Sequence, residues 1–436
     1  MKITFLGATE SVTGSLSLLE SQDLLYAVDA GFYQGENADE ALLEKLPFDP
    51  KDLSAVFLTH AHLDHSGFLP RLTNLGFRGK IYCTPQTATL MQIILNDSAR
   101  LLEKRTDTRL QDLYTTQDVQ TVVSLLKTIP FHHPFKCDHM QVEFKRAGHI
   151  LGAASVEITA EKKVLFSGDL GRSDDVLLAP PEPAQGRYDL VVMESTYGDR
   201  ERPAGMEAEL NSFLVRLQSE GRPGLLASFA VARAQNLIYL LHRFLKRHPE
   251  YELPIYVDGP MLHKANKVYA KFAADTKDPH GLTEALEAFE AVEFFHQRKS
   301  LGNKEGAFLI LSSSGMLSGG PIMTHLQALA PERRALLFLP GYMSPGTLGY
   351  DFLHGERMIN LGEGATAQWL GEVVHSDCFS SHADQSELIA WIKGCAPGTR
   401  VALNHGEASS KRALQVKLAE LGLAAFIPET GDVVEL

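Results

Sequence analysis

Apolar residues along this chain fall mostly in short runs, and several of these runs end at glycine, serine or aspartate. A short apolar run bounded by turn-forming residues predicts a buried strand, whereas apolar residues spaced three and four apart predict one face of a helix. The first 200 residues predict helices at 69–75, 86–104 and 114–126, and strands at 3–6, 15–19, 24–28, 55–58, 80–84, 140–144, 163–166 and 190–193. We therefore expect a mixed α/β domain in this part of the chain.

The order of predicted elements changes after residue 200, where helices and strands alternate. Strand, helix and strand in succession indicate a parallel sheet. A chain of 436 residues also exceeds what one hydrophobic core usually accommodates. We therefore expect an inserted α/β domain at 201–367, with 1–200 and 368–436 forming the other domain. The elements expected after residue 200 are helices from 203, at 234–246 and at 385–393, and strands at 224–228, 254–257, 307–311, 335–339 and 400–403.

Composition narrows the class of protein. Hydrophobic residues make up 44% of the chain and charged residues 22%, which is typical of a globular protein, and no stretch approaches the roughly 18 uninterrupted apolar residues of a membrane span. The four cysteines are too scattered for a metal or redox motif and too few for a disulfide scaffold. We therefore expect a cytoplasmic protein without a membrane partner, and we assign the cysteines no role.

The net charge of −13 bears on the kind of ligand. A protein that binds nucleic acid mainly by releasing counterions is usually basic, so the charge argues against a nonspecific nucleic-acid binder. It argues less against a nuclease, because bound metal ions supply local positive charge.

The strongest chemical signal lies in LSAVFLTHAHLDHSG at 53–67, where an apolar strand ends in His60, His62, Asp64 and His65. Imidazole nitrogens and a carboxylate are ligands for divalent ions. Four such groups in so short a span are too many for one closed site, so the spacing predicts two ions and further ligands from elsewhere. The alternative is a surface loop that is rich in histidine, but such a loop would lack the fixed order and the preceding strand.

Three more candidate residues each follow a predicted strand and lie within two residues of a glycine. His149 follows Gly148, and Asp169 lies between Gly168 and Leu170-Gly171, so the backbone can approach a crowded site. His149 could instead be an ordinary core histidine, and Asp169 could belong to an Asp-Gly turn. Asp29 precedes Ala30-Gly31 and could simply cap a turn.

The order H-x-H-x-D-H at 60–65 is the signature of the metallo-β-lactamase superfamily, and residues 2 to about 410 resemble its β-CASP nucleases. The segments SSSGMLSGGP and GYMSPGTLGYDFL, and the pair Arg233 and Gln235, are similar to segments of the β-CASP insert. Gly259 and Met343 depart from that pattern, because a serine and a glutamine are expected there. The resemblance implies an α/β fold, namely a metallo-β-lactamase αββα sandwich with an inserted β-CASP domain whose parallel sheet is flanked by helices.

The resemblance also implies roles for the candidate residues. It implies two Zn²⁺ per chain, with Asp169 bridging them and Asp29 orienting a bound histidine or water. Glu194, His382 and His405 match the three special motifs of the family, and a histidine at the third is the pattern of RNA-processing members similar to the cleavage-and-polyadenylation-factor nucleases. We expect one ion to be held by His60, His62 and His149, and the other by Asp64, His65 and His405.

These residues lead to an expected function: a zinc-dependent ribonuclease, with a two-metal hydroxide mechanism in which Asp64 and Glu194 take part and His382 is the general acid. Endonuclease activity is favoured, because exonuclease members carry an added C-terminal domain. The expected partner is RNA, and a homodimer is a candidate assembly. A hydrolase of small esters, thioesters or lactones, or an inactive RNA-binding scaffold, are the alternatives. Hydroxyl groups and backbone amides in loops can bind the phosphate of a substrate, although a plain turn has the same kind of sequence. The candidates are Ser312, Ser313, Ser314, Gly315, Ser380 and Ser381.

Overall fold

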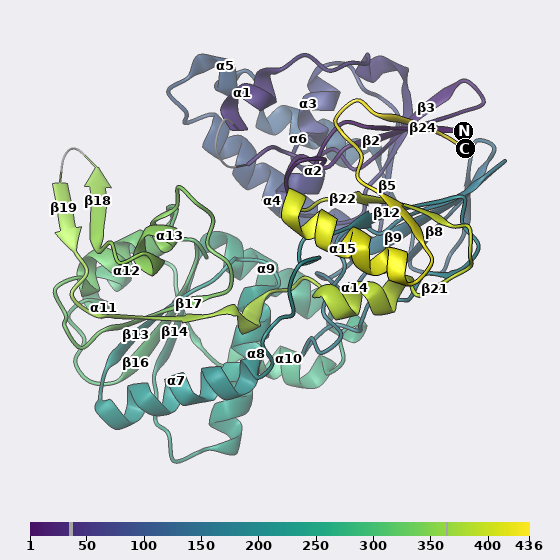
Figure 1. The fold of residues 1–436 in the computed structure, drawn as a ribbon. Helices are drawn as coiled ribbons and strands as arrows, with labels where there is room; N and C mark the ends of the chain where they lie inside the picture. The colour runs from purple at the N-terminus through teal and green to yellow at the C-terminus, as the bar shows by residue number, and fades with distance from the viewer. Residues whose placement is uncertain (35–37, 363–364) are drawn as a thin grey trace. The chain divides into compact units, whose positions relative to one another are not determined.

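The computed structural model describes residues 1–34, 38–362 and 365–436. The chain forms two compact units, which are described separately (Figure 1). The first contains Met1–Glu201 and His382–Leu436, and the second contains Arg202–Ser381.

The first unit is built on two seven-stranded sheets. In one sheet the strand order is β24 (Val433–Glu435), β1 (Lys2–Phe5), β2 (Ser17–Ser21), β3 (Leu24–Val28), β4 (Leu53–Phe57), β5 (Lys80–Cys83) and β6 (Leu126–Thr128). In the other it is β23 (Ala424–Phe426), β22 (Arg400–Asn404), β12 (Leu190–Glu194), β10 (Lys163–Phe166), β9 (Ala154–Thr159), β8 (Met140–Arg146) and β7 (Phe135–Cys137).

One hydrophobic core joins the inner faces of these two sheets. Phe5, Phe57, Phe144 and Phe166 are buried in it, and they come from β1, β4, β8 and β10. Because successive residues of a strand point to opposite faces, the remaining buried residues of these strands face the helices outside. The core is therefore the middle of a four-layer sandwich, as the resemblance implied.

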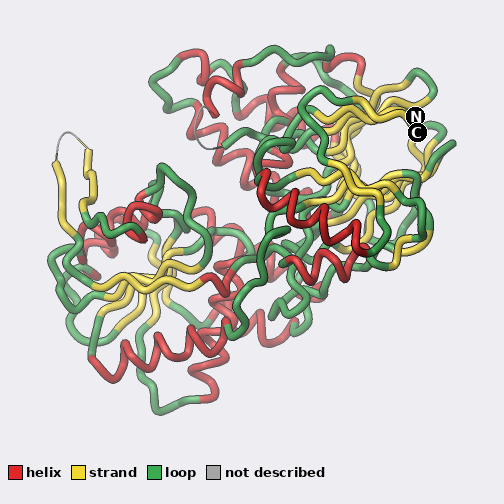
Figure 2. Tube along the Cα trace, in the orientation of Figure 1, coloured by secondary structure: helices red, strands yellow, loops and turns green. Residues whose placement is uncertain are grey.

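Helices cover the outer faces of both sheets (Figure 2). Helix α14 (Gln385–Ile392) begins with two reciprocal capping bonds, since Asp384 accepts from the Glu387 amide and Glu387 accepts from the Asp384 amide. A small parallel pair joins β11 (Gln185–Gly186) to β21 (Gly394–Cys395). The helices of this unit are α1 (Ala38–Leu43), α2 (Leu63–Ser66), α3 (Leu69–Asn74), α4 (Pro85–Leu102), α5 (Thr108–Gln111), α6 (Thr116–Leu125), α14 (Gln385–Ile392) and α15 (Ala408–Glu420), with a 3₁₀ turn at Pro50–Asp52.

The second unit has a six-stranded, entirely parallel sheet in the order β15 (Glu290–Val292), β14 (Ile255–Asp258), β16 (Phe308–Ser312), β13 (Pro223–Ala227), β17 (Leu336–Pro340) and β20 (Glu372–Ser376). Its helices are α7 (Met206–Glu220), α8 (Arg233–Arg247), α9 (Pro260–Lys271), α10 (Pro279–Glu287), α11 (Phe295–Leu301), α12 (Pro321–Leu329) and α13 (Leu348–Leu353), with 3₁₀ turns at Ala273–Asp275 and Asp377–Phe379. A hairpin of β18 (Met358–Gly362) and β19 (Ala365–Gln368) completes the unit.

The boundary predicted at residue 367 differs from the boundary in the structure. Strand β20 pairs with β17, so the chain leaves the second unit only after Ser381. Val373 and Val374 lie on this strand, whereas the predicted boundary places them in the other domain. A short apolar strand carries no local signal of which sheet it joins, because pairing is decided by the partner strand. The other boundary, predicted after residue 200, lies after Glu201.

Within the described ranges, every helix is too short or too polar to pass through a lipid bilayer.

Candidate metal centre

The candidate metal-binding residues lie at the carboxyl ends of strands in the first unit. Strand β10 is parallel to β12 and antiparallel to β9, and β9 is antiparallel to β8, so β8, β10 and β12 end at one edge of their sheet. Strand β22 is parallel to β12 and ends there too. In the other sheet β3 and β4 run parallel. Glu194 is the last residue of β12, and the loops after the other five strands carry Asp29, the 60–65 motif, His149, Asp169 and His405.

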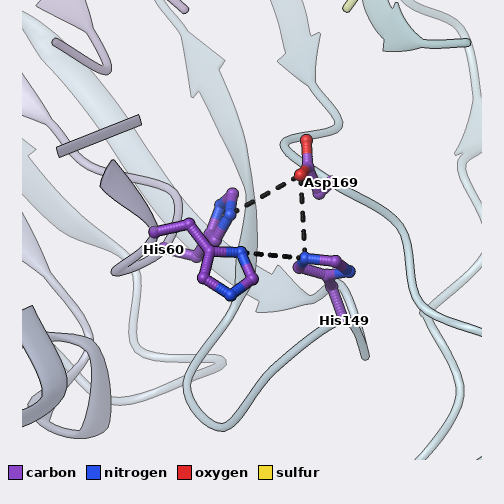
Figure 3. Close-up of side chains that lie close together, drawn as sticks. His60, His149 and Asp169 are labelled. Atoms are coloured by element: carbon purple, nitrogen blue, oxygen red, sulfur yellow. Dashed lines mark hydrogen bonds and ion pairs between the residues drawn. The ribbon is translucent and has the colours of Figure 1, made fainter. Parts of the chain in front are cut away.

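The first group of side chains consists of His60, His62, His149 and Asp169, whose candidate ligand atoms all lie within 4.8 Å of one another. His149 Nε2 lies 3.1 Å from His62 Nδ1 and 3.7 Å from Asp169 Oδ2. The same carboxylate oxygen lies 3.6 Å from His60 Nε2. Figure 3 shows the side chains of His60, His149 and Asp169 turned towards one another.

The second group consists of Asp64, His65, Asp169 and His405 and satisfies the same distance limit. His65 Nε2 lies 3.1 Å from Asp169 Oδ1 and 3.1 Å from His405 Nε2. His405 Nε2 lies 3.6 Å from Asp64 Oδ2. Asp169 is shared by the two groups, and its two oxygens face different histidines.

These separations fit a metal ion at the centre of each group. Tetrahedral zinc has ligand bonds of about 2.0 to 2.2 Å, so two of its ligand atoms are about 3.3 to 3.6 Å apart. The facing atoms of both groups are 3.1 to 3.7 Å apart. Side chains gathered by hydrophobic packing alone would not place so many lone pairs at this spacing.

Unsatisfied polar atoms at the centre support the same conclusion. His60 Nε2 is buried and makes no hydrogen bond within the described part of the chain, and Asp169 Oδ1 makes none either, although it lies 3.1 Å from His65 Nε2. A buried polar atom without a hydrogen bond costs about 1 to 3 kcal/mol, so such atoms are rare unless a ligand satisfies them. Both atoms face the other candidate ligands, and an ion bound there would satisfy them.

The histidines of the site differ in the direction in which their surroundings shift the pKa. Burial holds the pKa of His60 and of His149 well below the usual histidine value, and it lowers the pKa of His62. These imidazoles are therefore neutral and retain a lone pair, as metal binding requires. Burial would also lower the pKa of His65, but the carboxylates of Asp169 and Asp29 outweigh it and raise that pKa well above the usual value.

Asp29 holds His65 from behind. Asp29 Oδ2 lies 2.7 Å from His65 Nδ1, and its carboxylate also accepts from the Thr59 amide at 2.8 Å and from the Thr59 hydroxyl at 2.9 Å. An acceptor at one ring nitrogen fixes the orientation of the other, and His65 Nε2 is the nitrogen that faces the centre. Asp29 itself has a left-handed backbone conformation, with φ 62°, which turns the chain at the end of β3.

Glu194 and His382 lie beside the first group. His382 Nδ1 is 3.3 Å from Glu194 Oε1, and His382 Nε2 is 4.0 Å from Asp169 Oδ2. The His382 side chain is 21% exposed, so a solvent molecule or substrate can reach it. Burial would lower the pKa of His382, but the Glu194 carboxylate raises it above the usual value. Glu194 also accepts from the Leu170 amide, at 2.6 Å, which fixes the carboxylate.

Sequence reasoning missed the residues that hold these ligands. The Thr59 hydroxyl donates a hydrogen bond to Asp29, and the same hydroxyl oxygen lies 3.1 Å from His60 Nδ1. Thr196 lies 3.3 Å from His405 Nδ1, and Ser195 donates from its amide to the His405 carbonyl. The one signal in the sequence was position, because each of these hydroxyl residues lies within two residues of the end of an apolar strand.

The residues predicted to contact substrate phosphate belong to the second unit. Ser312 ends strand β16 and is fully buried. Ser313, Ser314 and Ser381 are partly exposed, whereas Gly315 and Ser380 are buried. Phosphate binding by this set stays a prediction.

The four-layer fold and the paired groups of histidine and carboxylate define a metal-dependent hydrolase of the metallo-β-lactamase type. Family models agree. The Metallo-beta-lactamase superfamily matches residues 13–214, the Beta-Casp domain matches 234–352, and the Zn-dependent metallo-hydrolase RNA specificity domain matches 370–428.

Whole-length relatives give the same result. The chain is 35% identical to Ribonuclease TTHA0252 of Thermus thermophilus over the full length of both proteins. It is 29% identical to the transcription termination factor FttA of Methanocaldococcus jannaschii, over 94% of this chain and 67% of that protein, and 27% identical to an RNase J-like protein of the same organism, over 100% and 99%. The chain belongs to the β-CASP family of the metallo-β-lactamase superfamily.

Solved structures support the fold. A protein of unknown function from Enterococcus faecalis V583 superposes with a TM-score of 0.59 at 16% identity, and the match covers 100% of this chain and 99% of that one.

Proposed function

We propose that this protein is a two-zinc ribonuclease that cleaves RNA internally. The observation that carries the proposal is the pair of ligand groups that share Asp169. Such a pair suits phosphodiester hydrolysis, in which two ions act together on one phosphate. Relatives named as ribonuclease and as RNase J-like protein, which match along the whole chain, support RNA as the substrate.

The ligand assignment follows the two groups. His60, His62 and His149 would hold one ion, and Asp64, His65 and His405 the other, and Asp169 would serve both because it belongs to both groups. Bound in this way, the two ions would supply a nucleophile at neutral pH and neutralise charge on the phosphodiester.

The chain's own contribution to the chemistry is proton delivery. His382 presents Nε2 towards the centre, and Glu194 accepts a hydrogen bond at Nδ1, so the ring is held in one orientation. A proton at Nε2 would be delivered to the ribose oxygen that leaves when the phosphodiester is cleaved. Glu194 acts through His382 and is therefore a positioning residue.

The preference for RNA can be tested with end-labelled substrates. We expect the zinc-loaded protein to cleave single-stranded RNA well above DNA of the same sequence, because His405 matches the pattern of RNA-processing members. Fragments of intermediate length from both 5′-labelled and 3′-labelled RNA, ending in 5′-phosphate and 3′-hydroxyl, indicate endonuclease cleavage. Equal rates on RNA and DNA would remove His405 as a guide to substrate, and release of mononucleotides alone would indicate an exonuclease.

A second prediction concerns Asp29. Asp29→Asn retains the size of the side chain but weakens the acceptor that orients His65, so zinc affinity should fall by about 10-fold to 100-fold. Competition with a chromophoric chelator measures this change. Asp23→Asn is the matched control, since Asp23 lies in the exposed turn before β3. Unchanged zinc affinity in Asp29→Asn would remove Asp29 from the site.

Two other expectations stay predictions. The homodimer requires a measurement of molar mass in solution, such as light scattering during gel filtration. The cytoplasmic location requires a measurement in cells.

A further inference from the structure

A buried lysine contacts the loop that packs against His405, a member of the second ligand group. Lys411 is on the first turns of α15 and has an exposed fraction of 0%. Its ammonium donates to the carbonyl of Ala8, at 3.4 Å, and to the carbonyl of Thr9. Lysine is almost never fully buried unless its charge is paired, so this position needs an explanation.

The loop that Lys411 bonds also holds the backbone of His405. The Ala8 carbonyl accepts from the His405 amide at 2.8 Å, and the Ser11 carbonyl accepts from the next amide, that of Gly406, at 3.1 Å. The Asn404 side chain donates to the Gly7 carbonyl at 3.1 Å. The loop at 7–11 is therefore the surface against which the chain from 404 to 406 is fixed.

The backbone of both partners adopts the left-handed conformation. Ala8 has φ 55° and His405 has φ 49°, in a region that residues with a side chain seldom occupy. Such a conformation persists only where the surrounding structure holds it. The Ala8 carbonyl accepts from both the Lys411 ammonium and the His405 amide. Lys411 therefore holds in place the carbonyl that positions the backbone of His405.

We propose that Lys411 is a positioning residue for His405, and that it sets the affinity of the ion held by Asp64, His65 and His405. The proposal rests on the proposed function, because it takes His405 to be a metal ligand. Lys411 contacts the two carbonyls and not the ion, so it acts only through the loop at 7–11.

The charge of Lys411 supports this role. Burial lowers its pKa to about 8, and the carboxylates of Glu407 and Glu10 oppose the shift. The side chain is therefore an ammonium at pH 7. An ammonium has three donors and no acceptor, and bonds from a charged donor to a carbonyl are stronger than neutral ones.

The test compares two lysines of the same helix. Lys411→Met retains the length of the side chain but removes the donors. Lys417→Met is the control, since Lys417 is 44% exposed and pairs only with Glu420 within the described residues. We expect Lys411→Met to weaken one of the two zinc ions by about 10-fold to 100-fold in chelator competition and to leave the other unchanged. Lys417→Met should leave both unchanged.

Two further variants separate positioning from general stabilisation. When Lys411→Met is added to His405→Ala, zinc affinity should fall no further, because the lysine acts through a side chain that is already absent. Lys411→Gln, which retains an N–H donor, should recover part of the lost affinity, and it carries the test if Lys411→Met does not fold. A lower melting temperature with both ions bound as tightly as in the wild type would overturn the proposal. A wild-type protein that binds no zinc would instead contradict the proposed function.

Discussion

Asp169→Ala is expected to remove both zinc ions and to abolish RNA cleavage. Asp169 Oδ2 faces His60 and Asp169 Oδ1 faces His65, so one substitution removes an oxygen from each ligand group. Loss of a residue that merely orients a ligand costs about 10-fold to 100-fold in affinity, so loss of a shared ligand should cost more than about 100-fold. Metal analysis after dialysis should give two zinc ions per wild-type chain and close to none in the variant.

Two controls make this result specific. His60→Ala removes a candidate ligand of the first group only, so the second ion should be retained more strongly than in Asp169→Ala. Asp112→Ala changes an exposed carboxylate that follows α5 and should retain both ions. A wild-type protein that saturates at one ion would end the two-metal mechanism, and two tightly bound ions in Asp169→Ala would show that Asp169 is no bridge.

His382→Ala is expected to retain zinc and to lose about 10²-fold to 10⁴-fold of RNA cleavage, the range for loss of a general acid. Cleavage of RNA expels a strongly basic ribose oxygen, which must be protonated as it leaves. A nitrophenyl phosphodiester expels a weakly basic phenolate that needs little such help. The variant should therefore retain far more activity on the nitrophenyl ester than on RNA, and comparing the two rates measures the effect.

Glu194→Gln should show the same selectivity more weakly, because it removes the charge that orients His382 and leaves the imidazole in place. His132→Ala is a matched control, since that histidine is 44% exposed and its recorded ion-pair partners are Glu143 and Glu182. If His382→Ala slows both substrates by the same factor, or loses zinc, His382 is a ligand or a positioning residue and the acid lies elsewhere.

The sequence predicted most elements because their signals are local. Strand β4 and helix α4 follow from the spacing of apolar residues within one short window. The motif at 60–65 was equally visible, because four ligand-type side chains lie within six positions. His149 and Asp169 each follow a predicted strand and lie beside glycine, whereas His405 is indicated only by its match to the third special motif of the family.

Pairing across the chain was decided by the tertiary structure. The sequence carried no sign that β20 joins the inserted sheet, because an apolar strand fits either sheet until its partner is known. In the sequence, Lys411 looks like an ordinary surface lysine of a helix. Only the fold brings its ammonium to two carbonyls that are 402 and 403 positions away along the chain. The sequence by itself determined which side chains are available to hold metal, because ligand chemistry belongs to residue type. Only the tertiary structure decided which ring nitrogens face one another and what holds them there, because those distances arise from contacts between segments that are remote along the chain.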